Sequence, residues 1–412
     1  MKKSLLVLMV LLLVPIGLMA EPKPRDMILT VVSSAPRDEP VLGPAYEAFT
    51  DLTGIEVEVI VADISTGSTI TIDTMIAAGE APDVYTDYLP RTGKFVDPAY
   101  ALALDDYLDL SAYNPAIIGQ LKREGKHYGM MRAASAQGMW VNLDILDEAG
   151  YTIPDNWTTD DFLDMAKAVK KIGKYATILF AANQSGDYFY MNWFASFNTQ
   201  LYAEGYTEST ADSPEGLATL EFLQGMIDDG YIPRESAVYS DDDYLREMFL
   251  GNCAVGGLFV GHLPVLYNMV EQGTIEKAPN FKFVGFPGGA AACSMPHAVV
   301  GKASDDEERN AMVALLISFM TSQETQTRHV LSDSKPFPTR KDVTVEPDDV
   351  NWRAVKAVVA ANGTYDLGLA HPTYAEIRKQ MFPLLQEMYV GDITPAEAIK
   401  AYDDAVTAIL QE

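Results

Sequence analysis

Residues 27–85 alternate between short apolar runs and amphipathic stretches. Runs rich in β-branched residues predict strands, and apolar positions three to four residues apart predict helices. The order is a strand at 27–32, a helix at 42–52, a strand at 55–61, a helix at 70–78 and a strand at 83–85. Gly54 and Gly79 follow the two helices as stop signals. This alternation predicts an α/β fold with a parallel sheet.

Further along, the same patterns predict two strands around a crossover, two later strands and five helices. The strands are at 127–133, 138–141, 253–259 and 281–286; the helices begin at Thr158, Leu217, Tyr244, Ser304 and Thr394. Ser304 to Glu307 and Thr394 to Glu397 have the spacing of capping boxes. We find no internal repeat and no low-complexity tract.

The charge excludes several classes of partner. The chain has 412 residues, with 30 Lys and Arg against 58 Asp and Glu, which gives a net charge of −28. Binding to nucleic acid or to anionic lipid needs a basic surface, so neither is expected. A hydrophobic content of 48% excludes disorder, and the length predicts two to three domains.

Residues 1–20 have the pattern of a signal peptide. A basic start at Lys2 and Lys3 precedes an apolar run from Leu5 to Met19, and the small residue Ala20 ends it. The run is shorter than the about 20 residues of a membrane-spanning helix, so we expect cleavage near Ala20 rather than an anchor. The mature protein is then exported, to the periplasm or the exterior.

Catalytic and cofactor motifs are absent from the sequence, which predicts no enzyme, no metal and no cofactor. The five histidines have no metal-ligand spacing. Cys293 and His297 are only four residues apart, whereas a nucleophile and its base are normally distant in sequence. The spacing therefore favours a buried thiol and a loop histidine. The run 241–243 (Asp-Asp-Asp) favours a solvated helix start over a calcium loop. Whether Cys253 and Cys293 form a disulfide stays open.

Five segments in order resemble the extracellular solute-binding proteins of bacterial ABC importers, in the sugar-binding branch that includes maltose-binding protein. They are Phe49 to Val57 (FTDLTGIEV), Ile76 to Val84 (IAAGEAPDV), Val141 to Leu146 with Asn156 to Thr158, Phe249 to Val255 (FLGNCAV) and Phe337 to Lys341 (FPTRK). Each segment is a weak signal alone; their order along nearly the whole mature chain makes the resemblance specific.

The resemblance implies two α/β lobes, each a mainly parallel sheet flanked by helices, with a hinged cleft between them. By position, lobe one is 21–132 plus 297–345, and lobe two is 133–296 plus 346–412. The implied function is capture of a small carbohydrate-like ligand in the cleft and its delivery to a membrane permease by a monomeric protein. Ligands of open α/β sheets bind beyond the carboxyl ends of the strands, so the loops there hold the candidates.

In lobe one the ligand-binding candidates follow the first three predicted strands. They are Ser33, Arg37, Thr66, Tyr85, Asp87 and Arg91. The hydroxyl residues are equally suited to helix capping, and Asp87 with Arg91 is equally suited to a surface salt bridge. The resemblance favours Asp87 and Arg91 as ligand contacts, because they follow the segment that reads PDV.

In lobe two the candidates combine aromatic rings with polar groups, which suits the apolar faces and polar rims of sugars. They are Asp187, Tyr188, Trp193, Phe259, His262, Tyr374 and Arg378. Trp193 is equally suited to the core of a helix, four residues after Phe189. Phe259 or His262, and Tyr374, stand where the family often has tryptophan.

This shortage of tryptophan suggests a smaller or more polar ligand than a long oligosaccharide. Arg37, Arg91 and Arg378 would together suit an anionic ligand such as a sugar phosphate. Three further hypotheses stay open, namely a polyamine ligand, a secreted glycoside-cleaving enzyme and a sensor subunit. The enzyme would need two carboxyl groups about 5 to 9 Å apart.

Overall fold

The computed structural model describes residues 26–33, 39–61, 70–182, 187–259, 262–289, 294–363, 365, 367–369 and 371–412. Their contacts divide the chain into two units. Unit 1 lies within 26–134, 295–347 and 369–372; unit 2 lies within 135–294, 348–368 and 373–412. Strand β6 (Met130–Asn142) runs from unit 1 into unit 2, and strand β9 (Ser294–Gly301) enters unit 1 at its second residue.

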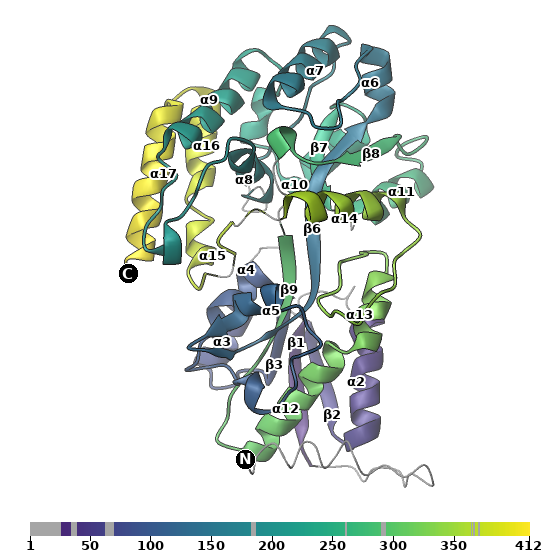
Figure 1. The fold of residues 1–412 in the computed structure, drawn as a ribbon, viewed down its shortest axis with the longest axis vertical. Coiled ribbons are helices and arrows are strands. Elements are labelled where there is room, and N and C mark those ends of the chain that lie inside the picture. The colour runs from purple at the N-terminus through teal and green to yellow at the C-terminus, as the bar shows by residue number, and fades with distance from the viewer. Residues whose placement is uncertain are drawn as a thin grey trace. The chain divides into compact units, whose positions relative to one another are not determined.

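The remaining elements of unit 1 include the predicted ones in their order along the chain (Figure 1). They are β1 (Ile28–Ser33), α2 (Glu39–Thr53), β2 (Glu56–Val61), α3 (Ile70–Ala77), β3 (Val84–Tyr88), α4 (Leu89–Thr92), α5 (Pro115–Ile118), β4 (Lys122–Arg123), β5 (Lys126–His127), α12 (Glu307–Met320) and α13 (Gln323–Val330). Strand β1 pairs in parallel with β2 and β3, and β9 pairs antiparallel with β3. The first three predicted strands and two helices are confirmed, and β9 makes the sheet mixed.

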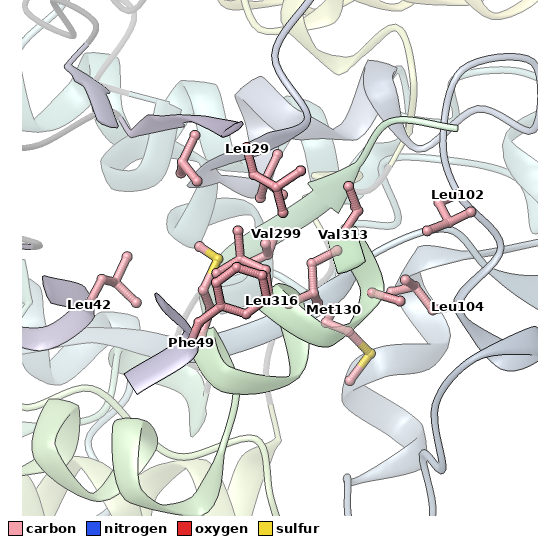
Figure 2. Close-up of a cluster of buried hydrophobic side chains, with 14 of the residues drawn as sticks. Leu29, Leu42, Phe49, Leu102, Leu104, Met130, Val299, Val313 and Leu316 are labelled. Carbon is pink, nitrogen blue, oxygen red and sulfur yellow. The ribbon is translucent and has the colours of Figure 1, made fainter. Parts of the chain in front are cut away.

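One hydrophobic cluster joins this sheet to its helices. Figure 2 shows side chains of the strands meeting those of α2 and α12, which pack against each other. Its labelled members are Leu29, Leu42, Phe49, Leu102, Leu104, Met130, Val299, Val313 and Leu316. All of them are fully or almost fully buried, so the amphipathic pattern at 42–52 buries its apolar face here.

The carboxylate of Asp83 fixes the start of β3 against β1 and α12. The Nε and Nη2 atoms of Arg309 lie 2.6 and 2.8 Å from its two oxygens, and the backbone N–H of Thr30 donates to Oδ2 at 2.8 Å. Arg309 also donates to the carbonyl of Ile28 at 3.0 Å. Burial and, second, the charge of Asp83 raise the pKa of Tyr100 to about 12. The aspartate of the PDV segment therefore has a structural role.

Unit 2 holds the other helices and strands (Figure 1). They are α6 (Leu143–Ala149), α7 (Thr159–Lys171), α8 (Asp187–Ser196), α9 (Pro214–Asp228), α10 (Asp241–Phe249), β7 (Val255–Phe259), α11 (Leu263–Glu271), β8 (Phe281–Val284), α14 (Val350–Asn362), α15 (Tyr374–Ile377), α16 (Met381–Val390) and α17 (Pro395–Leu410). Strand β6 pairs antiparallel with both β7 and β8. The described strand pairs of unit 2 are thus antiparallel, which corrects the expectation of a mainly parallel sheet there. The expected parallel pairing holds for the first three strands.

The predicted pair of strands around a crossover is wrong, because 130–142 form one continuous strand. Within 133–138 all residues but Ser135 are buried, and the second half of the strand is paired on both sides. Gly138 is small for a packing reason: a Cβ there would lie 1.6 Å from Cζ of Phe283. Gly138 is therefore a position where β8 approaches the backbone of β6 closely.

The helix starts predicted at Thr158 and Thr394 are confirmed, whereas the helices expected from Leu217 and Tyr244 begin earlier, at Pro214 and Asp241. Thr158 and Thr394 form capping boxes, and Ser240 forms a third with Asp243, so the acidic run 241–243 is a helix start. The predicted box at Ser304 is wrong, because Asp306 is the N-cap of α12 and accepts from the next backbone N–H groups. Ser304 instead bonds the side chain of Asn310.

Neither a metal cluster nor a membrane-spanning helix is found among the described residues. No group of three or more His, Cys, Asp or Glu within them is placed to hold a metal ion. No helix in the same part of the chain is long and apolar enough to cross a bilayer.

Cys253 is a free, fully buried thiol immediately before β7. Burial, and secondarily the charge of Glu247, raise its pKa well above the usual value. Because the thiolate is the reactive form, the side chain is both shielded and chemically quiet. The disulfide to Cys293, which the sequence left open, is absent for Cys253 in this structure; Cys293 lies outside the described residues.

Replacing Asp83 should cost stability, because Asp83→Asn removes the charge opposite the partly buried Arg309. We expect a loss of about 2 kcal/mol in the free energy of unfolding, measured by urea denaturation. Asp106→Asn is the matched control, since it removes an exposed pair with Lys126 in the same unit. Equal denaturation midpoints for the two variants would contradict the assigned role of Asp83.

The Cys253 thiol should resist modification in the folded protein. In a Cys293→Ser background, a thiol-specific chromogenic reagent at about pH 8 should react negligibly with native protein and with one thiol after unfolding. Rapid reaction of the native variant would show that Cys253 is accessible.

Candidate functional site

The carboxyl end of β3 gathers three of the predicted polar side chains of unit 1. Tyr85 and Asp87 are two residues apart and lie on one face of the strand, where the Tyr85 hydroxyl donates to Asp87 Oδ2 at 2.9 Å. The backbone N–H of Tyr88 donates to the other oxygen at 2.7 Å. Asp87 is only 2% exposed, and Ser33 at the end of the neighbouring β1 is 3% exposed. These groups therefore form an ordered, polar strand end.

Three other predicted residues of unit 1 cannot be placed at this surface. Arg37 and Thr66 lie outside the described residues. The backbone of Arg91 belongs to α4, directly after β3, but its side chain is outside the described part of the structure. The proposed contact between Arg91 and Asp87 thus remains a prediction.

A buried arginine lies behind this strand end, and sequence reasoning missed it. Arg132 of β6 is 2% exposed. Its Nε donates to the hydroxyl of Thr86 at 3.1 Å, and its Nη2 lies 3.1 Å from Nδ1 of His297. Its Nη1 lies 3.5 Å from Nδ1 of His329. A lone cation inside the apolar run 130–134 was the available signal, because a buried charge requires partners.

Unit 2 contains a small cavity where four helices meet. Its volume is about 10 Å³, room for about one water molecule. The lining residues are Tyr190 and Met191 of α8, Tyr374 and Ile377 of α15, Arg378, Met381 of α16 and Tyr402 of α17. Three phenol rings, two thioethers and one guanidinium thus surround a single space.

Two predicted residues, Tyr374 and Arg378, meet in this cavity. They are four residues apart, so α15 presents them on the same side. Tyr374 is 2% and Arg378 8% exposed, so both side chains are buried in unit 2. Tyr190 and Tyr402 were not predicted as site residues, because both lie outside α15 in sequence and no local pattern joins them to it.

Trp193 is a core residue in this structure. It is 2% exposed, and its ring lies 4.9 Å from that of Phe162 and 5.5 Å from that of Phe222. The other three tryptophans, Trp140, Trp157 and Trp352, are at most 3% exposed. No indole of the chain is therefore available as a stacking surface, and tyrosine supplies the rings of the cavity.

The remaining candidates are only partly described. Asp187 and Tyr188 start α8 and Phe259 ends β7, but their side chains lie outside the described residues. His262 is half-buried and is the N-cap residue of α11, without a side-chain capping bond. Their contact with a ligand remains a prediction.

A family model described as the bacterial extracellular solute-binding protein matches residues 34–327. Among curated proteins, a binding protein of Brucella abortus is 23% identical over 353 residues, which cover 83% of this chain and 82% of that protein.

Two solved structures share the fold. The GacH receptor of Streptomyces glaucescens, described unliganded and with acarbose, is 16% identical with a TM-score of 0.78, over 94% of this chain and 99% of that one. UgpB of Mycobacterium tuberculosis, in complex with glycerophosphocholine, is 17% identical with a TM-score of 0.78 and the same coverage.

The burial of Trp193 predicts a large effect on stability. Trp193→Ala should lower the free energy of unfolding by about 3–5 kcal/mol, because it leaves a cavity among aromatic rings. Tyr267→Ala is a suitable control, since Tyr267 of the same unit is 51% exposed. A small loss for Trp193→Ala in urea denaturation would contradict the core assignment.

Proposed function

The chain belongs to the bacterial extracellular solute-binding protein family, and we propose that it is the exported capture component of an ABC importer for a small carbohydrate-like solute. The observation that carries the ligand class is the group of Tyr190, Tyr374, Tyr402 and Arg378 in unit 2. The space that they line holds about one water molecule, so the proposal requires that this space widens when a solute binds. Tyrosine rings offer flat apolar faces to sugar C–H groups, and their hydroxyls bond sugar oxygens.

The polar end of β3 supports the same proposal from unit 1. The Asp87 carboxylate is held in place by the Tyr85 hydroxyl and the Tyr88 backbone N–H. An ordered carboxylate binds a sugar hydroxyl at little entropic cost, because its side chain is not immobilised anew. Asp87, Arg91 and Ser33 are the residues that we propose contact ligand from this unit.

An anionic solute is the second candidate. Arg378 places a guanidinium in the cavity, and a guanidinium binds phosphate oxygens in a bidentate manner. The bound glycerophosphocholine of UgpB is a phosphodiester, and that protein shares the fold. A sugar phosphate or a related phosphodiester would satisfy both the tyrosines and the arginine.

We further propose that the protein acts outside the membrane after cleavage near Ala20. As a monomer it would bind its solute without chemical change and transfer it to permease subunits of the importer. Its acidic charge suits solubility, and no part of this role needs a cofactor.

A thermal unfolding screen of residues 21–412 tests the function. The compounds are maltotriose, arabinotriose, glucose 6-phosphate, glycerophosphocholine and spermidine. A compound that binds only the folded state stabilises it by about 2.7 kcal/mol at about 100 times its Kd. A rise in Tm with one sugar supports the proposal, provided that the sugar is recovered chemically unchanged after incubation with the protein. A rise with the phosphate compounds alone supports the second candidate, and a rise with spermidine alone contradicts both.

Substitutions in the cavity then test the site by calorimetric titration with the compound that raises Tm. Tyr374→Phe and Arg378→Gln should weaken binding at least about tenfold each, since each removes a polar contact of about 1.4 kcal/mol or more. Tyr267→Phe changes an exposed tyrosine of the same unit and should not. Unchanged affinity in both cavity variants would exclude this cavity as the site.

A further inference from the structure

We propose that His297 is a positioning residue, which holds Tyr88 at the ligand-facing end of β3 only while its imidazole is neutral. The inference rests on the proposed function, because it assigns the end of β3 to a ligand. His297 and Tyr88 are direct partners in the register of β9 and β3. Their ring centroids are 4.2 Å apart with an interplanar angle of 61°.

The protonation state follows from the chemistry of Arg132. A guanidinium has five N–H donors and no acceptor. Its Nη2 lies 3.1 Å from His297 Nδ1, so Nδ1 accepts and the imidazole proton is on Nε2. The same reasoning applies to His329, whose Nδ1 lies 3.5 Å from Nη1.

The position of Tyr88 in turn affects the polar pair beside it. The Tyr88 backbone N–H donates to Asp87 Oδ1 at 2.7 Å, and Asp87 accepts from Tyr85 through its other oxygen. Tyr88 is thus joined to His297 by its ring and, by its backbone, to the carboxylate that we propose contacts ligand. Arg132 is buried and acts through His297.

Protonation of His297 reverses this arrangement. An imidazolium carries N–H on both nitrogens, so Nδ1–H would face the N–H of Arg132. The charged and titratable groups placed around it within the described residues include Arg132 from β6, His329 from α13, and Asp87 and Tyr88 from β3. The guanidinium contact is the closest of these, so acid should displace the ring from Arg132 and with it Tyr88.

Fluorine NMR of protein labelled with 3-fluorotyrosine tests this without any ligand. The resonance of Tyr88, assigned with Tyr88→Phe, should move between about pH 8 and about pH 5, where histidine titrates. In His297→Gln the side-chain oxygen still accepts from Arg132 but does not titrate, so the movement should be lost. His329→Gln is the matched control and should keep it.

Histidine ¹⁵N spectra give the second measurement, with an Nε2-protonated neutral ring expected for His297 at about pH 8. A Tyr88 resonance that is independent of pH, or one that still moves in His297→Gln, overturns the proposal. If His297→Gln does not fold, His297→Asn is used in its place. An Nδ1-protonated ring in the wild type would by itself contradict the proposal. Failure of the Tm screen with these results intact would overturn the proposed function alone.

Discussion

The need to satisfy a buried guanidinium organises the strand ends of unit 1. Arg132 lies in β6, and its partners come from β3, β9 and α13, so one side chain joins four elements. Removing a charge from water is costly unless it is hydrogen-bonded in the protein. Each partner is on a different element, so the desolvation of Arg132 is compensated only when β3, β9 and α13 pack around it. This requirement fixes the positions of the strand ends.

Asp83 has a comparable role at the opposite end of β3. Its carboxylate joins β1 and α12 through Thr30 and Arg309. The strand is thus held by an anion where it begins and lies against the Arg132 cluster where it ends. The polar pair of Tyr85 and Asp87 lies between these two fixed points.

Local patterns predicted much of the fold but less of the site. The strands of β1 to β3 and the capped starts of α7 and α17 were visible in the sequence, because each depends on neighbouring residues. The continuous β6 was missed, since Gly138 serves the packing of Phe283 from a distant strand. In the cavity, Tyr374 and Arg378 were predicted from the resemblance. Tyr190 was missed, because only the tertiary structure brings α8 to α15.

All four tryptophans, Trp140, Trp157, Trp193 and Trp352, belong to unit 2 and are buried there. Indole emission consequently reports the folding of unit 2 alone, whereas tyrosines occur in both units. Comparing indole emission with far-ultraviolet circular dichroism, to which the helices of both units contribute, separates the unfolding of unit 2 from that of the whole chain. Whether the units melt together or in sequence can be followed in the intact chain without introducing any dye.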